Sequence, residues 1–192
     1  MSLISLSPNA SGTGVFTVAS PNSNVDRVLT LPDESGTVDT LQRSGNVVQV
    51  VNFQTGAFAS GTTTIPFDDT IPQITEGDEY MTLAITPTNA SNILRIDVVI
   101  GTVSCSLSSR MVAALFLDAG ANALASCGAP MAINDNENLA LIHWMVSDST
   151  SSLTFKVRVG GNNGTTNFNG GSGARLYGGV LASSITITEM TP

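Results

Sequence analysis

A hydrophobic alternation with a period of two residues recurs after residue 47, and it constrains the fold more than any other feature. In residues 94–100, LRIDVVI, apolar side chains fill every second position, and an arginine and an aspartate fill two of the positions between them. The same alternation occurs in residues 81–86 (MTLAIT), 153–159 (LTFKVRV) and 184–188 (SITIT). Such segments have one face in a core and one in water, which is typical of half-buried antiparallel strands.

Turn-forming residues separate these segments at regular places. Clusters of Gly, Pro, Asn and Asp occur at residues 55–61, 66–77, 87–92, 133–138 and 160–173. Strands spaced in this way, without helical segments between them, are typical of a sandwich or a barrel. We therefore predict an all-β chain whose main domain is an antiparallel β-sandwich.

One segment has two interpretations. Residues 110–127, RMVAALFLDAGANALASC, are rich in alanine, which is a good helix former, but they could also form two strands around residues 118–120. Gly120 lies in the middle of the segment, where it would cost a helix about 1 kcal/mol. The hairpin is therefore the favoured prediction.

The first forty residues differ from the rest because they hold too few apolar residues for a core of their own. Residues 15–18 (VFTV) and 27–31 (RVLTL) are strand-like but short, and a two-stranded unit of this size is marginal alone in water. We predict an attachment or trimerisation arm at residues 1–43 and a folded domain at residues 44–192. The arm residues expected to pack against other chains are Val15, Phe16, Val18, Val28, Leu29 and Leu31.

Charge makes two classes of partner improbable. Seven Lys and Arg stand against fifteen Asp and Glu, which gives a net charge of −8 and no basic run that could neutralise phosphates. Neither nucleic acid nor an anionic membrane is therefore an expected partner. No apolar run approaches the roughly 20 residues of a membrane span, and the first ten residues lack the pattern of a secretory signal. We expect folding in a cytoplasm.

That compartment bears on the two cysteines, Cys105 and Cys127. A disulfide is conceivable, but a reducing cytoplasm favours two free, buried thiols. The sequence contains no Cys-x-x-Cys motif of the kind that binds zinc or carries out redox chemistry.

No residue pattern predicts catalysis. His143 lies in an apolar strand without a recognisable nucleophile motif, so we interpret it as a packed or interface residue. Trp144, the single tryptophan, is expected to anchor the core or a subunit interface, with a sugar-stacking platform as the alternative. We predict no enzyme activity and no cofactor.

The acidic clusters are the other place where chemistry could reside. Their members are Asp68, Asp69, Glu76, Asp78 and Glu79. A solvated loop is the favoured interpretation, and a calcium site or a carboxylate pair that cleaves glycans are the alternatives. Residues 134–138 (NDNEN) offer oxygen ligands but lack the spacing of a calcium-binding hand loop, so no metal site is predicted there.

The most glycine-rich stretch is residues 160–173, GGNNGTTNFNGGSG. It could be a long hairpin loop, or a binding loop that presents an aromatic ring among amides, a combination that suits carbohydrate. In the second interpretation the receptor-binding residues are Asn162, Asn163, Asn167, Phe168 and Asn169.

Both ends of the chain resemble proteins of tailed bacteriophages. Residues 7–38 resemble a module of phage tail-fibre proteins whose pattern is matched by Thr30, Leu31, Pro32, Asp33, Gly36, Thr37 and Val38. Residues 175–190, RLYGGVLASSITITEM, are similar to the closing strand of phage fibre tips. Such tips are trimeric jelly rolls, distantly like the heads of tumour necrosis factor and complement proteins.

The resemblance implies a structural virion protein. It would be a homotrimeric fibre or tip, assembled in the host cytoplasm and attached by its arm to a capsid or tail protein. Its jelly roll would project outward and contact a glycan of the host surface. A capsid decoration or head-fibre protein is the alternative, and a spike enzyme that cleaves glycans is a further one.

Overall fold

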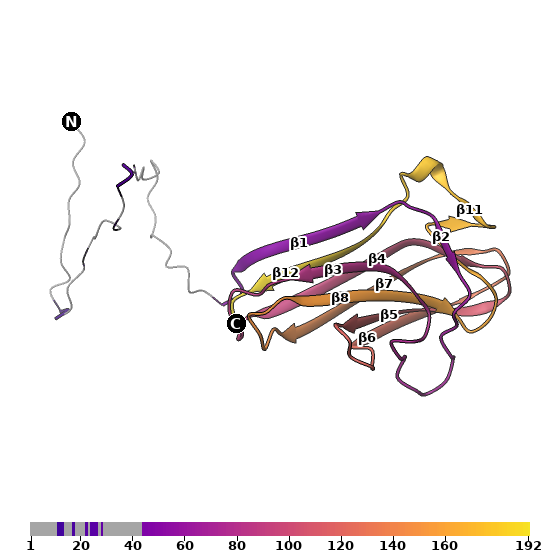
Figure 1. Cartoon of the computed structure of the whole chain (residues 1–192), viewed down its shortest axis with the longest axis horizontal. Helices are drawn as coiled ribbons and strands as arrows, with labels where there is room; N and C mark the ends of the chain where they lie inside the picture. Colours follow the sequence, from indigo (N-terminus) through magenta and orange to yellow (C-terminus); the bar gives the residue numbers. More distant parts are fainter. Residues whose placement is uncertain (1–10, 14–16, 18–21, 23, 27, 29–43) are drawn as a thin grey trace. The chain divides into compact units, whose positions relative to one another are not determined.

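The computed structural model describes residues 44–192, together with residues 11–13, 17, 22, 24–26 and 28 (Figure 1). The chain divides into two compact units, Met1–Asp39 and Thr40–Pro192. Of the predicted arm residues, Val28 is described and exposed. The other five, with the motif at residues 30–38, lie outside the described residues. The second unit contains every strand described below.

Two antiparallel sheets make up this unit. The larger contains β1 (Val47–Thr55), β2 (Ala59–Gly61), β4 (Ile93–Cys105), β7 (Asn136–Val146), β9 (Thr166–Phe168) and β12 (Ser183–Met190). The smaller contains β3 (Asp78–Ile85), β5 (Ser109–Leu117), β6 (Ala125–Met131) and β8 (Leu153–Gly161). A short ribbon of β10 (Gly170–Gly171) and β11 (Ala174–Arg175) precedes a single 3₁₀ turn, Tyr177–Gly179.

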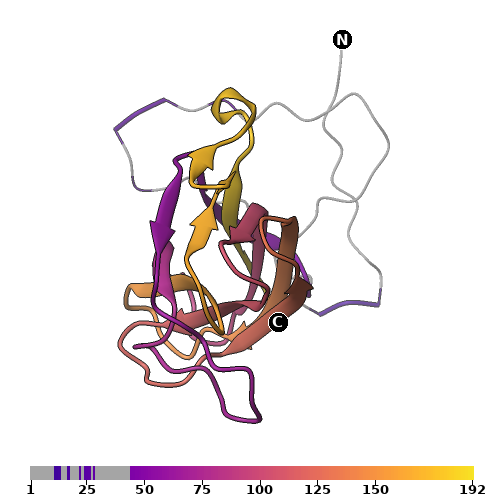
Figure 2. The same cartoon turned by 90° about the vertical axis from the view of Figure 1, so that its right-hand side faces the viewer.

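The strand order is that of a jelly roll. Neighbouring strands run β1-β12-β4-β7 in the larger sheet and β3-β8-β5-β6 in the smaller one. Figures 1 and 2 show the two sheets facing each other. These four strands of the larger sheet and the four of the smaller one, connected in this order, form the eight-stranded jelly roll, to which β2 and β9 are added. The predicted all-β fold with an antiparallel sandwich is confirmed.

β4 organises the larger sheet because it has different neighbours along its length. β7 pairs with one edge of β4, and β12 and β9 pair in turn with the other edge. Gly101 lies where β12 gives way to β9, and a Cβ there would collide with the carbonyl oxygen of Ala182. A glycine is therefore needed at this crossing of strands.

The core lies between the sheets and comes from the alternation seen in the sequence. Inward-facing residues of four strands are fully or almost fully buried; among them are Leu94, Ile96, Val98, Ile100, Met81, Ile85, Phe155, Val157, Val159, Ile185 and Ile187. The residues between them are more exposed, as a half-buried sheet requires.

A second, smaller cluster covers part of the outer face of the smaller sheet. Ile65, from the long segment between β2 and β3, packs on Ala114 and Phe116 of β5. The segment is tied down by Asp78, whose carboxylate accepts hydrogen bonds from the Thr63 amide (3.1 Å) and hydroxyl (2.8 Å). This loop therefore belongs to the fold and shapes the surface beside β5.

Two local predictions are confirmed. Residues 110–127 form a hairpin of β5 and β6, and Asp118 in its turn has a φ of 51°. Both cysteines are free, as predicted. Cys105 is buried and donates its thiol hydrogen to the Asn163 carbonyl oxygen, whereas Cys127 is half-buried, so the predicted burial is confirmed for Cys105 alone.

Candidate interaction surface

The outer face of the larger sheet carries mainly apolar and neutral polar side chains, with one arginine and one aspartate among them. Register places four cross-strand rows on this face: Val47–Met190–Ile93–Val146, Val50–Thr188–Arg95–Trp144, Asn52–Thr186–Asp97–Ile142 and Gln54–Ser184–Val99–Ala140. We call these residues the β1–β7 face. Trp144 is 54% exposed and Ile142 is 57% exposed. Exposed apolar area gathered in this way on the surface of a domain is typical of an interaction site.

The two charges on the β1–β7 face neutralise each other. The Arg95 guanidinium lies 2.7 Å from the Asp97 carboxylate, and its carbon lies 5.5 Å from the centroid of the Trp144 ring. The face thus has no net charge in a chain whose net charge is −8. An exposed tryptophan beside an arginine, with few other charges, fits the composition of protein interfaces, where aromatic residues and arginine are enriched.

The start and end of the domain lie together beside this face. The Gly45 amide donates to the Thr191 carbonyl (3.0 Å), and the Thr191 amide donates to the Asn46 carbonyl (3.0 Å). The Asn46 amide also donates to the Thr191 hydroxyl (3.1 Å). The chain therefore enters the domain, at Ser44 and Gly45, at the end of β1 that carries the first row of the β1–β7 face.

Beneath that end lies a buried carboxylate, Glu189, which is fully shielded from solvent. It accepts hydrogen bonds from the Thr88 amide and hydroxyl (both 2.8 Å), the Asn92 amide group (2.6 Å) and the Gln49 amide group. Burial alone would raise the pKa of Glu189, but these donors outweigh burial and hold the pKa below its ordinary value. The carboxylate thus ties β1 and the loop after β3 to the last strand.

The predicted receptor-binding loop is largely an interior segment. Residues 166–168 form β9, which pairs with β4 on one side and β2 on the other. Phe168 is 1% exposed, and its ring stacks on that of Tyr80. The prediction that Phe168 is presented to a ligand is therefore wrong.

Asn167 and Asn169 are buried as well, and their amides serve the fold. The Asn167 side chain donates to the Ser104 hydroxyl (3.2 Å). The Asn169 side chain donates to the Thr55 carbonyl (2.8 Å) and accepts from the Ser183 hydroxyl (2.6 Å). A ligand cannot reach either residue in this structure, so their assignment as receptor contacts is also corrected.

Asn162 and Asn163 differ from these three because they are exposed. The Asn162 side-chain oxygen accepts from the Ser109 hydroxyl (2.9 Å) and the Arg110 amide (2.8 Å). A binding role for Asn162 and Asn163 stays a prediction.

The acidic clusters have structural partners. Glu76 accepts a hydrogen bond from the Gln73 amide (2.9 Å), and Glu79 lies 3.5 Å from Arg158 and 3.9 Å from Lys156. Asp68 and Asp69 are on an exposed loop. Across residues 44–192 and the few described residues before them, no group of three or more His, Cys, Asp or Glu is placed to hold a metal ion.

His143 and Trp144 point to opposite faces of β7. His143 is half-buried on the inner face, where burial lowers its pKa and favours the neutral ring. Trp144 is on the outer face, so it is not part of the core.

Within the described part of the chain, no helix is long and apolar enough to cross a membrane.

No protein-family model matches the sequence, so the resemblance of residues 7–38 to the tail-fibre module has no support from a family model. No curated protein matches the sequence either.

Several solved structures are similar to this chain, all at low identity. One is a chain of infectious bursal disease virus, Gx strain, at 11% identity and a TM-score of 0.37, over 86% of this chain and 41% of that one. Another is dimeric latent PorU of Porphyromonas gingivalis, at 7% identity and a TM-score of 0.35, over 78% and 14%. A third is the enzymatically active domain of tailspike protein 4 of bacteriophage CBA120, at 16% identity and a TM-score of 0.26, over 64% and 19%. This chain spans less than half of the length of each.

Proposed function

We propose that this chain is a structural protein of a tailed-phage virion and assembles as a homotrimer. Residues 1–43 attach it to another virion protein, and the jelly roll points outward and contacts a glycan of the host surface. The phage assignment and the number of three depend on the resemblance of residues 7–38 and 175–190 to fibre proteins. No catalytic step belongs to this role.

The observation that carries the assembly proposal is the β1–β7 face. Exposed apolar residues lie at both edges of this face, on β7 with Trp144 and on β1, and its only charges, Arg95 and Asp97, pair with each other. A second and third copy of this chain are its proposed occupants. Copies that repel through a net charge of −8 each would meet most favourably where that charge is absent.

The point at which the chain enters the domain, at Ser44 and Gly45, supports the same arrangement. β1 belongs to the β1–β7 face. Copies joined through this face would therefore bring together the points at which residues 1–43 connect to each domain. The short apolar stretches at residues 15–18 and 27–31 would then have neighbouring chains to pair with, which removes the exposed edges of a lone hairpin.

The mass of the full chain in solution tests the assembly. Light scattering behind a size-exclusion column is expected to give three times the 19.8 kDa of one chain. A single-chain mass at micromolar concentration would overturn it.

The location is tested separately by electron microscopy of virions carrying a labelled antibody against residues 44–192. Label on the tail supports a fibre or tip, and label on the head supports the decoration alternative. Absence from purified virions would overturn both. Release of oligosaccharide from host polysaccharide would replace the structural role with an enzyme.

A further inference from the structure

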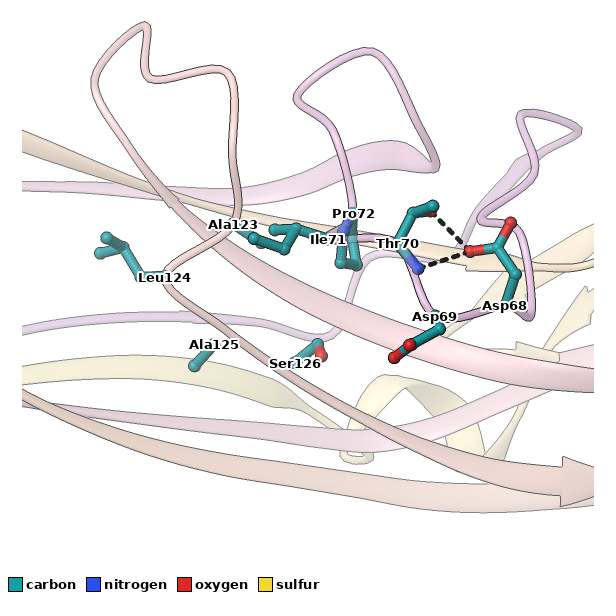
Figure 3. A pocket seen from close by; sticks show the side chains of 9 residues that line it. All are labelled: Asp68, Asp69, Thr70, Ile71, Pro72, Ala123, Leu124, Ala125 and Ser126. Atoms are coloured by element: carbon teal, nitrogen blue, oxygen red, sulfur yellow. Dashed lines mark hydrogen bonds between the residues drawn. The ribbon is translucent and has the colours of Figure 1, made fainter.

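Three hollows lie in a row along β6 on the outer side of the smaller sheet. The first, about 380 Å³, lies between the loop of residues 68–72 and residues 123–126 (Figure 3). The second, about 280 Å³, shares Ser126 with the first and extends to Pro130. The third, about 520 Å³, shares Arg110 and Pro130 with the second and reaches Asn162. Because neighbouring hollows share lining residues, we treat the three as one site, which we call the β6 groove.

The length of the β6 groove suits an extended chain. The seven residues of β6 alone span about 23 Å. On the outward face of this strand, Gly128 has no side chain, which leaves the floor of the middle hollow open between Ser126 and Pro130. A single small molecule would fill only one of the three hollows.

At the middle of the groove an aromatic ring and a cation lie together. Phe67 is 64% exposed, and the guanidinium carbon of Arg110 lies 4.9 Å from its ring centroid. Arg95, Lys156 and Arg158 each have a carboxylate within ion-pair distance. Within the described residues Arg110 has none, so its charge is available to an incoming anion.

At one end of the groove the polar groups are already held in place. The Asn162 oxygen is fixed by Ser109 and by the Arg110 amide, so its amide hydrogens are left as oriented donors. The exposed Ser108 side chain lines the same hollow. Fixed donors of this kind bind acceptor oxygens without a further ordering cost.

The opposite end is acidic. Asp68 and Asp69 border the first hollow, and the Thr70 amide (2.9 Å) and hydroxyl (2.5 Å) donate to one oxygen of Asp68 (Figure 3). Carboxylates accept hydrogen bonds from hydroxyl groups but repel anions. A ligand that fills the groove must therefore carry hydroxyl groups here and a negative charge only near Arg110.

We propose that the β6 groove binds a polysaccharide that carries a carboxylate on one sugar of its repeat, with neutral sugars between. The acidic sugar lies at Arg110, a neighbouring ring stacks on Phe67, and hydroxyl groups donate to Asp68 and Asp69. An extended peptide added at the free edge of β6 is the competing occupant, and Pro130 removes one backbone donor from that edge. The proposal rests on the outward, host-facing position of the jelly roll and gives it a ligand class and a site.

An array of purified bacterial surface polysaccharides tests this with the labelled full chain. The array holds neutral polymers, polymers with one uronic or sialic acid per repeat, and polymers acidic at every sugar. Binding is expected in the second class, and Arg110→Gln and Phe67→Ala are each expected to weaken it about tenfold or more. Arg175→Gln, which removes another exposed charge with no carboxylate partner among the described residues, is the matched control and should bind as the parent does.

Three results would overturn the proposal: no binding in the second class, equal binding to neutral polymers, or binding that Arg110→Gln leaves unchanged. Capture of extended peptides that depends on Arg110 would overturn the sugar assignment. The variants change exposed side chains, so their melting temperatures should match that of the parent.

Light scattering on the same samples separates this proposal from the assembly. A trimer that binds no polysaccharide overturns the groove alone. A monomer that binds acidic polysaccharide overturns the assembly alone.

Discussion

The ring of Phe168 lies on the ring of Tyr80, with centroids 4.6 Å apart and planes 8° from parallel. This contact joins β9 of the larger sheet to β3 of the smaller one, across the end of the sandwich where β12 is absent. It gives a stretch rich in glycine and asparagine a fixed place in the core. Stacked pairs of this kind add to the free energy of burial.

Phe168→Ala is expected to lower the free energy of unfolding by about 3–5 kcal/mol, because it leaves a cavity at a fully buried site. Urea unfolding followed by circular dichroism measures this. Phe67→Ala is the matched control and should change the value by less than about 1 kcal/mol, since Phe67 is mostly exposed. An equal loss in both variants would contradict the burial of β9.

Tyr80→Phe is expected to leave stability unchanged or raise it by up to about 1 kcal/mol. Among the described residues, the buried Tyr80 hydroxyl has no hydrogen-bond partner, and burial together with the nearby Asp78 charge raises its pKa. Removing an unsatisfied polar group from the interior removes its desolvation cost while the stacked ring stays. A melting-temperature scan checks this. A loss of about 2 kcal/mol or more would mean that the hydroxyl has a partner.

Ile142→Glu is expected to convert the proposed trimer into monomers without unfolding the jelly roll. It places an unpaired charge among the exposed apolar residues of β7 on the β1–β7 face and costs about 2 kcal/mol or more per contact, or about thirtyfold in affinity. Sedimentation over a range of concentrations measures this. Val180→Glu adds the same charge to an exposed apolar residue outside this face and should leave the mass unchanged. Identical behaviour of the two variants would remove this face from the assembly.

Glu189→Gln is expected to lower the free energy of unfolding by about 1–3 kcal/mol at neutral pH. The glutamine NH₂ group would replace a carboxylate oxygen that accepts hydrogen bonds in the parent, so it would face other donors. The pKa of Glu189 in the folded chain lies below the ordinary 4.5. The carboxylate therefore stabilises the fold above that value, and the stabilisation is lost as pH falls through the folded pKa.

The difference between parent and Glu189→Gln should consequently be largest above about pH 5 and shrink in more acidic buffer. Guanidinium unfolding at several pH values follows this. Asp135→Asn, at an exposed turn, is the control and should differ little from the parent at any pH. A difference that grows on acidification would reverse the assignment.

The alternation of residues 94–100 and 184–188 predicts strands whose inward faces match the observed core. The same alternation puts Glu189 on the inner face after Ile185 and Ile187, so its burial has a signal in the sequence. Its donors come from Gln49, Thr88 and Asn92, which lie about a hundred residues or more away, and no local pattern announces them.

Residues 166–169 show where local reasoning fails. Asparagine is typical of loops, so the sequence predicts that these residues lie in one. In the structure the side-chain amides of Asn167 and Asn169 instead donate to Ser104 and Thr55, which other strands bring close. The β1–β7 face could not be predicted from the sequence for a related reason. Its rows exist only through the register of four strands, which alternation alone does not determine.

The hydrogen bonds between Asn46 and Thr191 close β1 and β12 at one end, and this has a mechanical consequence. A pull that separates the two chain termini of the domain would open the β1–β12 ladder one hydrogen bond at a time, from the Asn46 end. A pull on Gly45 against the opposite end of the sandwich would instead act along β1 and β12. It would load the eight paired positions of that ladder together. The domain should therefore resist a pull through its length far better than a pull that separates its two termini.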